Sequence, residues 1–382
     1  MTDAKATAQQ TVDSAADALV DLSHRLHANP EIRWEEEQSA RWTAEVLADH
    51  GFAVDEGVCD MPTAFVATAG SGPLTIAICA EYDALPGVGH ACGHNIIASA
   101  AVGAGLALAP LADDLGITVK VMGTPAEEGG GGKILMLERG AFAGVNAAMM
   151  VHPAPFELDS MPCLAVSHFE VHYQGKEAHA SAFPQLGINA ADALTIAQTA
   201  IGLLRQHIDP EARIHGIVKK GGDAPNVVPG HTYGEWLVRH ETLERLAGLE
   251  PKVDRCFEAG ALATGCTHSK VPIGPPYSEM RAIYRANAQA IGRKFNDEVA
   301  KIASSFAGST DMANISLAVP TIHPMLGLDS LPAVNHQPEF AEHCATPIAD
   351  KAVRDGAIAM AWTSIELGTT AATRERLLSH SV

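Results

Sequence analysis

Short apolar segments that alternate with helical segments constrain the fold of this chain more than any other feature. Residues 63–68, 74–79, 117–122 and 147–151 are apolar runs of strand length, and residues 96–108 and 132–139 between them are interpreted as helices. Strands that are buried on both faces and alternate with helices are typical of a largely parallel central sheet. We therefore predict an α/β domain whose ligands bind beyond the carboxyl ends of the strands.

A different pattern occupies residues 164–273. Strands at 164–173, 214–219, 231–238 and 268–273 and helices at 188–204 and 242–262 give the order βαββαβ, which is the ferredoxin-like arrangement. Gly274, Pro275 and Pro276 mark its end, and a helix is expected over residues 280–306. The chain of 382 residues is long enough for two domains. We predict a first domain of residues 1–163 and 274–382 and an inserted α+β domain of residues 164–273.

The composition limits the classes of function. Lys and Arg number 26 and Asp and Glu number 45, so the formal net charge is −19. Binding to nucleic acid or to an anionic membrane is not expected, because phosphate affinity needs surplus positive charge. The longest uncharged run, residues 95–112, is mostly Ala and Gly and is interpreted as a buried helix. Seven cysteines without a closely spaced framework indicate reduced thiols and a cytoplasmic protein.

Two metal-ligand residue types stand close together after the run at 74–79. Cys92 and His94 are two residues apart at an expected junction between a loop and a helix, and Gly93 lets the backbone bend between them. A thiolate beside an imidazole is a pair of transition-metal ligands. The segment alone leaves a structural alternative open, in which Cys92 is a small buried hydrophobe and His94 a hydrogen-bond donor at a helix N-terminus.

Two further strand ends carry residues of the same kind. Glu127 and Glu128 follow the run at 117–122 and precede four glycines, so one carboxylate can bind a metal while its neighbour acts as general base. As an alternative, an acidic pair in this position is a solvated helix start. His152 follows the run at 147–151. Three successive strand ends therefore bring Cys/His, Glu/Glu and His to the same edge of the predicted sheet.

Taken together, these segments resemble the M20 family of metallopeptidases and amidohydrolases. The GHACGHN and GSTDMANIS segments are most similar to the aminoacylase-like branch, which includes p-aminobenzoyl-glutamate hydrolase and mammalian dipeptidases. The similarity extends over nearly the whole chain and is carried by residues 26–31, 83–94, 125–132, 152, 178–181, 221–229 and 308–311.

The resemblance implies a zinc-exopeptidase-like fold in which residues 164–273 form a lid and the contact surface of a homodimer. It also implies two divalent metal ions per subunit, Zn or Mn, with Co or Ni as the alternatives. Cys92 would take the position that bridges the two ions. The implied ligands are Cys92, His94, Glu128, His152 and His336.

The same resemblance implies the catalytic roles. Glu127 would be the general base, His179 would contact the scissile carbonyl from its own subunit or from the neighbouring one, and Asn226 would contact the substrate. Many family members carry His-x-Asp where this chain has Glu81, Tyr82 and Asp83. We therefore interpret Asp83 as a residue that orients a ligand, and we do not count residue 81 among the ligands.

The predicted function is metal-dependent hydrolysis of an amide bond in a small N-acyl amino acid, a p-aminobenzoyl-glutamate-like amide or a dipeptide. One alternative is hydrolysis of another C–N bond, as in an aromatic amine or an auxin-like conjugate. Another is a protein that binds a metal or an amino acid without catalysis on the same scaffold. A third is a hydrolase in which Cys92 is the nucleophile.

Overall fold

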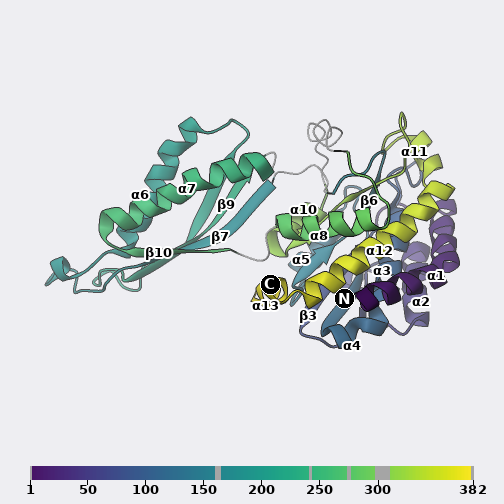
Figure 1. Cartoon of the computed structure of the whole chain (residues 1–382), viewed down its shortest axis with the longest axis horizontal. Helices are drawn as coiled ribbons and strands as arrows, with labels where there is room; N and C mark the ends of the chain where they lie inside the picture. The colour runs from purple at the N-terminus through teal and green to yellow at the C-terminus, as the bar shows by residue number, and fades with distance from the viewer. Residues whose placement is uncertain (1, 160–164, 241–242, 273–276, 297–309, 380–382) are drawn as a thin grey trace. The chain divides into compact units, whose positions relative to one another are not determined.

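The computed structural model describes residues 2–159, 165–240, 243–272, 277–296 and 310–379 (Figure 1). The chain divides into two compact units, one of Met1–Pro162 with Tyr277–Val382 and one of Cys163–Pro276. The predicted fold class, an α/β unit with a mostly parallel sheet and an inserted α+β unit, is confirmed.

A six-stranded sheet forms the centre of the first unit. Its strand order is β1-β2-β4-β3-β5-β11, in which β4, β3, β5 and β11 are parallel and β1 and β2 form an antiparallel edge. The strands are β1 Ala53–Glu56, β2 Phe65–Ala69, β3 Leu74–Ala80, β4 Ile117–Gly123, β5 Ala147–Met149 and β11 Thr321–Ile322. Strand β1, which is mostly exposed, and strand β11, which has two residues, were not predicted.

Helices cover both faces of this sheet. On one face α3 packs against α1 and α12, and on the other α5 contacts α10. Ile76 and Ile78 of β3 belong to the apolar cluster on the α3 side, whereas Ala77 and Cys79 belong to the cluster on the α5 side. The helices of this unit are α1 Thr2–Ala28, α2 Glu37–Asp49, α3 His94–Leu108, α4 Ala112–Leu115, α5 Gly132–Glu138, α8 Tyr277–Ala290, α10 Met312–Ala318, α11 Pro338–His343, α12 Pro347–Thr369 and α13 Ala371–Ser379.

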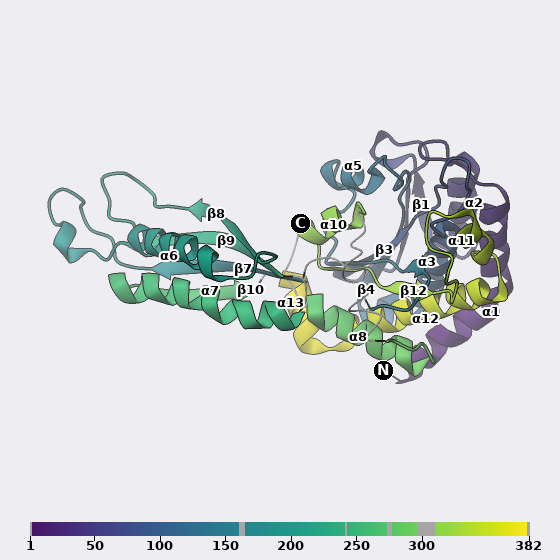
Figure 2. The same ribbon diagram turned by 90° about the horizontal axis from the view of Figure 1, so that it is seen from above.

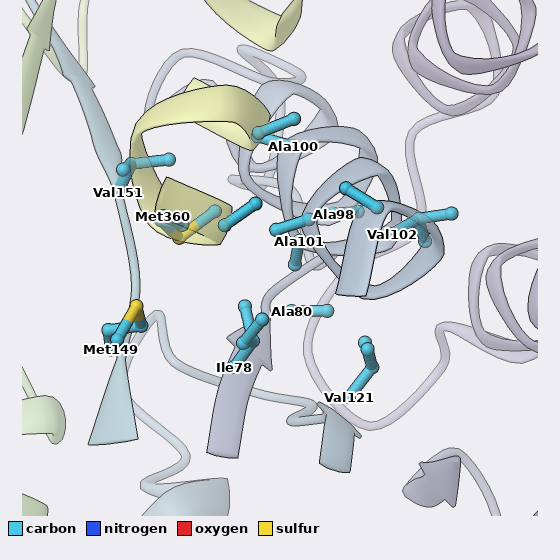
Figure 3. Packing of buried hydrophobic residues seen from close by; sticks show 14 of the residues in the cluster. Ile78, Ala80, Ala98, Ala100, Ala101, Val102, Val121, Met149, Val151 and Met360 are labelled. Atoms are coloured by element: carbon cyan, nitrogen blue, oxygen red, sulfur yellow. The ribbon is translucent and has the colours of Figure 1, made fainter. Parts of the chain in front are cut away.

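Helix α3 lies at the centre of the core, and all of its residues are buried. Figure 3 shows its small side chains meeting Ile78 and Val121 of the sheet and Met360 of α12. A Cβ at Gly103 would lie 2.8 Å from Ala357, so the glycine permits the close approach of α3 and α12. His94–Leu115 is long and apolar enough to cross a membrane by composition, but 83% of its most apolar window is buried inside the structure. The segment is therefore a core helix, as predicted.

Two sequence predictions in this unit were wrong in detail. His152 does not end a strand over 147–151; it begins a separate strand, β6 (His152–Ala154), which pairs in parallel with β12 (Met325–Gly327). The helix expected over 280–306 ends at Ala290, because Gly292 adopts a left-handed conformation with φ of 96°. Residues 297–306 of that prediction lie outside the described residues.

The second unit has the predicted order βαββαβ. Its antiparallel sheet has the strand order β10-β7-β9-β8, and Figure 2 shows α6 and α7 along one face of it. Phe169, Val171 and Tyr173 alternate along β7 and are buried beneath these helices. The elements are β7 Ala165–Gln174, α6 Ala190–Leu204, β8 Arg213–Lys220, β9 His231–His240, α7 Leu243–Thr264 and β10 Thr267–Pro272.

Candidate metal centre and active site

Cys92 and His94 are presented by the loop that joins β3 to α3. Gly93 between them has φ of 78°, and a Cβ at this position would lie 2.8 Å from the side chain of Pro153. Only glycine suits both conditions, because it adopts the left-handed conformation without strain and has no side chain. The backbone therefore turns tightly here, and Cys92 and His94 lie together at the start of the helix.

Two groups of potential ligand atoms share the sulfur of Cys92. The first contains Cys92, His94 and His152, and the second contains Cys92, Glu128 and His336; within each group the ligand atoms lie within 4.8 Å of one another. Cys92 Sγ is 3.5 Å from His152 Nε2 and 3.5 Å from His336 Nε2. His336 Nε2 is in turn 3.5 Å from Glu128 Oε1. The structure thus brings together all five residues that the resemblance to the M20 family implied as ligands.

These spacings and the state of the buried polar atoms fit a divalent cation. Ligand atoms about 2.0–2.3 Å from a tetrahedral zinc ion are separated by roughly 3.5 Å. His94 Nε2 and Glu128 Oε1 are buried and form no hydrogen bond within the described residues. Burial raises the pKa of Cys92 to about 12, so its thiolate needs a cation nearby. Buried polar atoms that lack hydrogen bonds are costly, and a bound cation would satisfy them.

Asp83 orients two of the candidate ligands. Its Oδ1 lies 3.0 Å from His94 Nδ1, and the Glu128 backbone N–H donates to its Oδ2 at 2.9 Å. Burial acts to raise the pKa of Asp83, but the His94 ring and the Glu128 N–H outweigh burial and lower it. The ionised carboxylate therefore holds Nδ1–H of His94 and directs Nε2 towards the ligand group.

Backbone carbonyls fix the other two histidines. His152 Nδ1 donates to the Pro153 carbonyl oxygen at 2.8 Å, which leaves Nε2 as the free lone pair facing Cys92. Burial lowers the pKa of His152 to about 4, so the ring is neutral and able to bind a metal. His336 lies in the loop before α11, where its backbone N–H donates to the Ala91 carbonyl at 2.8 Å and its φ is 70°.

Glu127 precedes Glu128 in a tight turn after β4. The turn contains Ala126, Gly129 and Gly131 with positive φ angles, and the Gly129 N–H donates to the Glu127 carbonyl at 2.6 Å. A carboxylate oxygen of Glu127 lies within 4.8 Å of His94 and Glu81 ligand atoms. The turn therefore places both acidic side chains beside the same group of potential ligands.

A buried ionic cluster beside this centre was not predicted from the sequence. Lys133 at the start of α5 is fully buried and contacts Glu81, and its Nζ lies 2.6 Å from Asp311 Oδ1. Glu81 Oε2 lies 3.4 Å from His94 Nε2 and has no hydrogen-bond partner among the residues that the structure describes. Burial acts to lower the pKa of Lys133, but Asp311 and Glu81 outweigh it and raise the pKa well above its usual value. Lys133 is therefore a cation that pairs with Asp311 and contacts Glu81, whose own pKa burial raises to about 8 although Lys133 and His94 act to lower it.

A signal for this cluster was present in the sequence. Lys133 is a single lysine in the otherwise apolar run 132–137, and Glu81 was set aside because family members carry histidine there. Asp311 belongs to the GSTD segment, of which residues 308 and 309 lie outside the described residues. A lysine on the buried face of a helix needs partners of opposite charge, so Lys133 implied acidic neighbours, but the rule does not identify them.

His179 and Asn226 lie together in the second unit. Both are exposed; His179 forms a bridge with Val227, and the Ala180 N–H donates to the Asn226 carbonyl at 3.0 Å. The Ala182 N–H donates to His179 Nδ1 at 3.2 Å. A backbone N–H can only donate, so Nδ1 is the acceptor and the neutral ring carries its proton on Nε2. His179 therefore presents an exposed Nε2–H donor.

Comparison with known proteins identifies the family. A model of peptidase family M20/M25/M40 matches residues 77–353. The chain belongs to this family. It is 36% identical to the Xaa-Arg dipeptidase of Mus musculus over 95% of this chain and 88% of that protein. It is 34% identical to one of the subunits of p-aminobenzoyl-glutamate hydrolase of Escherichia coli (strain K12), over 67% of this chain and 58% of that protein.

A solved structure has the same fold as this M20 protein. The Bacillus subtilis YXEP protein, described as a dinuclear metal-binding peptidase of the M20 family, superposes with a TM-score of 0.54 and 20% identity. The alignment covers 93% of this chain and 99% of that one. The predictions of an M20 family member and of a metal-dependent hydrolase of amide bonds are confirmed.

Proposed function

We propose that this M20 protein hydrolyses the amide bond of small N-acyl amino acids, p-aminobenzoyl-glutamate-like amides or dipeptides, with two divalent metal ions per subunit. The observation that carries the proposal is the shared Cys92 sulfur, which belongs to both ligand groups while Glu127 lies beside them. The proposed ligands are Cys92, His94, Glu128, His152 and His336.

The side chains divide the chemistry among them. When bound, divalent ions polarise an amide carbonyl and lower the pKa of water towards about 7. Glu127 takes the proton of the attacking water and returns it to the leaving amine nitrogen. His179 donates Nε2–H to the developing oxyanion, from its own subunit or from the neighbouring one. Asn226 contacts the substrate, and Asp83 keeps His94 and Glu128 in position.

The donor set favours some metals over others. One thiolate and three imidazoles favour Zn, whereas the carboxylates also suit Mn; Co and Ni are the alternatives. We propose Zn or Mn.

We also propose that residues 164–273 act as a lid and form the contact surface of a homodimer. Support comes from β8, an edge strand of the sheet on which Ile217 is 59% exposed. Apolar edge strands are usually covered by another chain or element. We propose a cytoplasmic location, in agreement with the described cysteines, all of which are free thiols.

Of the alternatives, hydrolysis of another C–N bond has one specific observation in its favour. The chain is 26% identical to IAA-amino acid hydrolase ILR1-like 4 of Arabidopsis thaliana over 85% of its length. The mechanism with Cys92 as nucleophile is less well supported, because burial raises the pKa of that thiol and its sulfur contacts two histidines at ligand spacing.

Metal analysis paired with an activity screen tests the proposed function. The purified protein should contain about two divalent ions per chain. It should cleave at least one of N-acyl amino acids, p-aminobenzoyl-glutamate, auxin conjugates and dipeptides. A chelator should abolish turnover, and added Zn or Mn should restore it. Cys92→Ala should lower the metal content, whereas Cys256→Ala, at a buried cysteine of the second unit, should not. Full activity in the chelated protein would contradict the proposal.

A further inference from the structure

The loop between α1 and α2 crosses both active-site loops of the first unit. Ile32 forms a parallel bridge with Ala84, and the Ala84 N–H donates to the Glu31 carbonyl at 2.8 Å. Ala84 directly follows Asp83, which orients His94 and Glu128. Residues 31–36 therefore lie against the loop that follows β3.

The far end of this loop is fixed to the acidic turn after β4. The buried Glu36 carboxylate accepts the Ala126 N–H at 2.8 Å and the Thr63 hydroxyl at 3.2 Å. Ala126 is the residue before Glu127, the proposed general base. Both ends of the segment 31–36 are thus attached to the active site, and the residues between them have defined positions at its rim.

Arg33 lies on the backbone of a proposed metal ligand. Its Nη1 donates to the Glu128 carbonyl oxygen at 2.9 Å, and a Cβ at Gly129 would lie 2.8 Å from the same nitrogen. Arg33 is exposed and forms no salt bridge within the described residues. The neighbouring Glu31 carboxylate is engaged with the Ser39 N–H and hydroxyl, each at 2.8 Å. Most of the guanidinium donors of Arg33 therefore remain for a ligand.

Trp34 stands beside Arg33 in a strained conformation. Its φ is 68°, which is rare for a bulky side chain, and 42% of its surface is exposed. A Cβ at Gly130 would lie 2.9 Å from Trp34 Cε2, so the indole rests on the glycine turn after Glu128. Trp34 belongs to none of the apolar clusters formed by the described residues. Backbone strain of this kind clusters at active sites and ligand clamps, and here it holds a large aromatic ring at the active-site rim instead of in the core.

We propose that Arg33 and Trp34 form a substrate subsite of this enzyme. Trp34 stacks on an aromatic ring in the acyl part of the substrate, and Arg33 pairs with a carboxylate of the amino-acid part. The inference rests on the proposed function and narrows its substrate class to N-aroyl derivatives of acidic amino acids. Substrates with a cationic side chain are disfavoured, because the Arg33 guanidinium is permanently charged.

Arginine replacement tests the charge recognition. The substrates are N-benzoyl-glutamate and its two mono-amides, N-benzoyl-glutamine and N-benzoyl-isoglutamine. Arg33→Met should lower kcat/KM for N-benzoyl-glutamate by about 10- to 100-fold, and should spare the mono-amide that lacks the paired carboxylate. Arg41→Met is the matched control, since Arg41 is an exposed arginine of α2 that faces Glu45. No effect of Arg33→Met, or an equal loss on all three compounds, would overturn the assignment.

Tryptophan replacement tests the aromatic recognition. Trp34→Gly removes the ring at a position whose φ suits glycine, so the fold is retained. It should lower the ratio of kcat/KM for N-benzoyl-glutamate to that for N-acetyl-glutamate by about 3- to 10-fold, and Trp34→Phe should preserve most of the ratio. An unchanged ratio in Trp34→Gly would refute the stacking contact.

A binding measurement on the metal-free protein of residues 1–382 separates this inference from the proposed function. N-(4-nitrobenzoyl)-glutamate should quench part of the emission of the four tryptophans. Trp34→Phe should remove that part, and Arg33→Met should weaken binding by about 10-fold or more. If both variants change the quenching as expected but the metal-loaded enzyme cleaves no amide, the subsite is supported and the proposed function is refuted. If the metal-loaded enzyme cleaves an amide but neither Trp34→Phe nor Arg33→Met changes the quenching, the proposed subsite is refuted and the proposed function stands.

Discussion

The metal centre and the His179–Asn226 loops place polar side chains in opposite ways. At the metal centre His94 and Glu81 are fully buried, and each retains an atom without a hydrogen bond to any described part of the chain. In the second unit His179 and Asn226 are exposed, and backbone hydrogen bonds hold their loops together. Burial of unsatisfied polar atoms costs free energy, whereas exposed residues in paired loops cost little.

This difference in burial predicts that substitutions in the two regions affect different properties of the protein. The metal centre has its donors positioned before an ion binds, because the Pro153 carbonyl holds His152 and Asp83 holds His94 and Glu128. Substitutions of the proposed ligands and of the residues that hold them should change metal content or stability together with turnover. Substitutions of His179 or Asn226 should change turnover alone, because these side chains are exposed and contribute little to the fold.

The largest expected effect belongs to Glu127. Glu127→Gln keeps the shape of the side chain but removes its capacity to accept a proton, so kcat should fall by about 10²- to 10⁴-fold. The metal content should stay at the wild-type value, because Glu127 is not among the proposed ligands. Steady-state kinetics and elemental analysis check both statements, with Glu138→Gln at the exposed end of α5 as the control. An enzyme that kept wild-type turnover would need another base.

Lys133 should show the largest effect on stability. Lys133→Met leaves Glu81 and Asp311 buried without their cation, which should lower the free energy of unfolding by about 3–5 kcal/mol. Urea denaturation of the metal-free protein measures the loss. The control is Lys219→Met in the second unit, where the partly exposed pair with Glu235 at 3.2 Å should contribute about 1 kcal/mol or less. Similar losses in the two variants would show that burial does not distinguish the regions.

His179 should affect turnover without affecting stability, in contrast to Lys133. His179→Ala should lower kcat by about 10²- to 10³-fold through loss of the Nε2–H donor, while metal content and unfolding free energy stay unchanged. His207→Ala, at another exposed histidine of the second unit, serves as the control and should retain full turnover. A His179 variant that lost metal or stability would contradict the separation of the two regions.

The sequence predicted those parts of the fold and site that depend on local pattern. The buried runs indicated the parallel strands, and the Cys92-Gly93-His94 and Glu127-Glu128 segments indicated ligands that one turn of backbone brings together. His336 is different, because its distance from Cys92 along the chain is too large for spacing to assign it. Only the resemblance to the M20 family identified it before the structure placed it at the centre.

Other features needed three-dimensional contacts between distant segments. Glu81, Lys133 and Asp311 meet from three separate elements, and no local rule pairs a lysine in a helix with a carboxylate 178 residues away. Arg33 and Trp34 lie in a loop without a recognisable motif, and their place at the rim follows from bonds to Ala84 and Ala126. Short strands such as β11 are likewise determined by pairing with β5 rather than by their own residues.

Asp83 should show an intermediate effect within the buried region. Asp83→Asn keeps the size of the side chain but weakens its hold on His94 Nδ1, and metal affinity should fall by about 10- to 100-fold. Competition with a chromophoric chelator measures this change. Asp55→Asn on the exposed edge strand β1 provides the control and should bind metal like the wild type. Unaltered affinity in Asp83→Asn would mean that the carbonyl-held histidines alone determine metal binding.

The smallest expected effect is the pH dependence of stability that Glu36 causes, because this residue is buried but both of its carboxyl oxygens accept hydrogen bonds. Burial, aided by Asp83, raises its pKa to about 7 although backbone N–H groups lower it. The folded state therefore binds the extra proton between about pH 4.5 and 7, so the stabilisation exists at low pH and is lost as pH rises through 7.

Wild-type unfolding free energy should fall by about 1–3 kcal/mol across this range relative to Glu36→Gln, which cannot titrate there. The exposed neighbour variant Glu37→Gln should follow the wild-type profile in urea denaturation from pH 4.5 to 8. If Glu36→Gln also followed the wild-type profile, the Glu36 carboxyl would have to be ionised over the whole pH range. The hydrogen bonds from Ala126 and Thr63 would then cancel the effect of burial on its pKa.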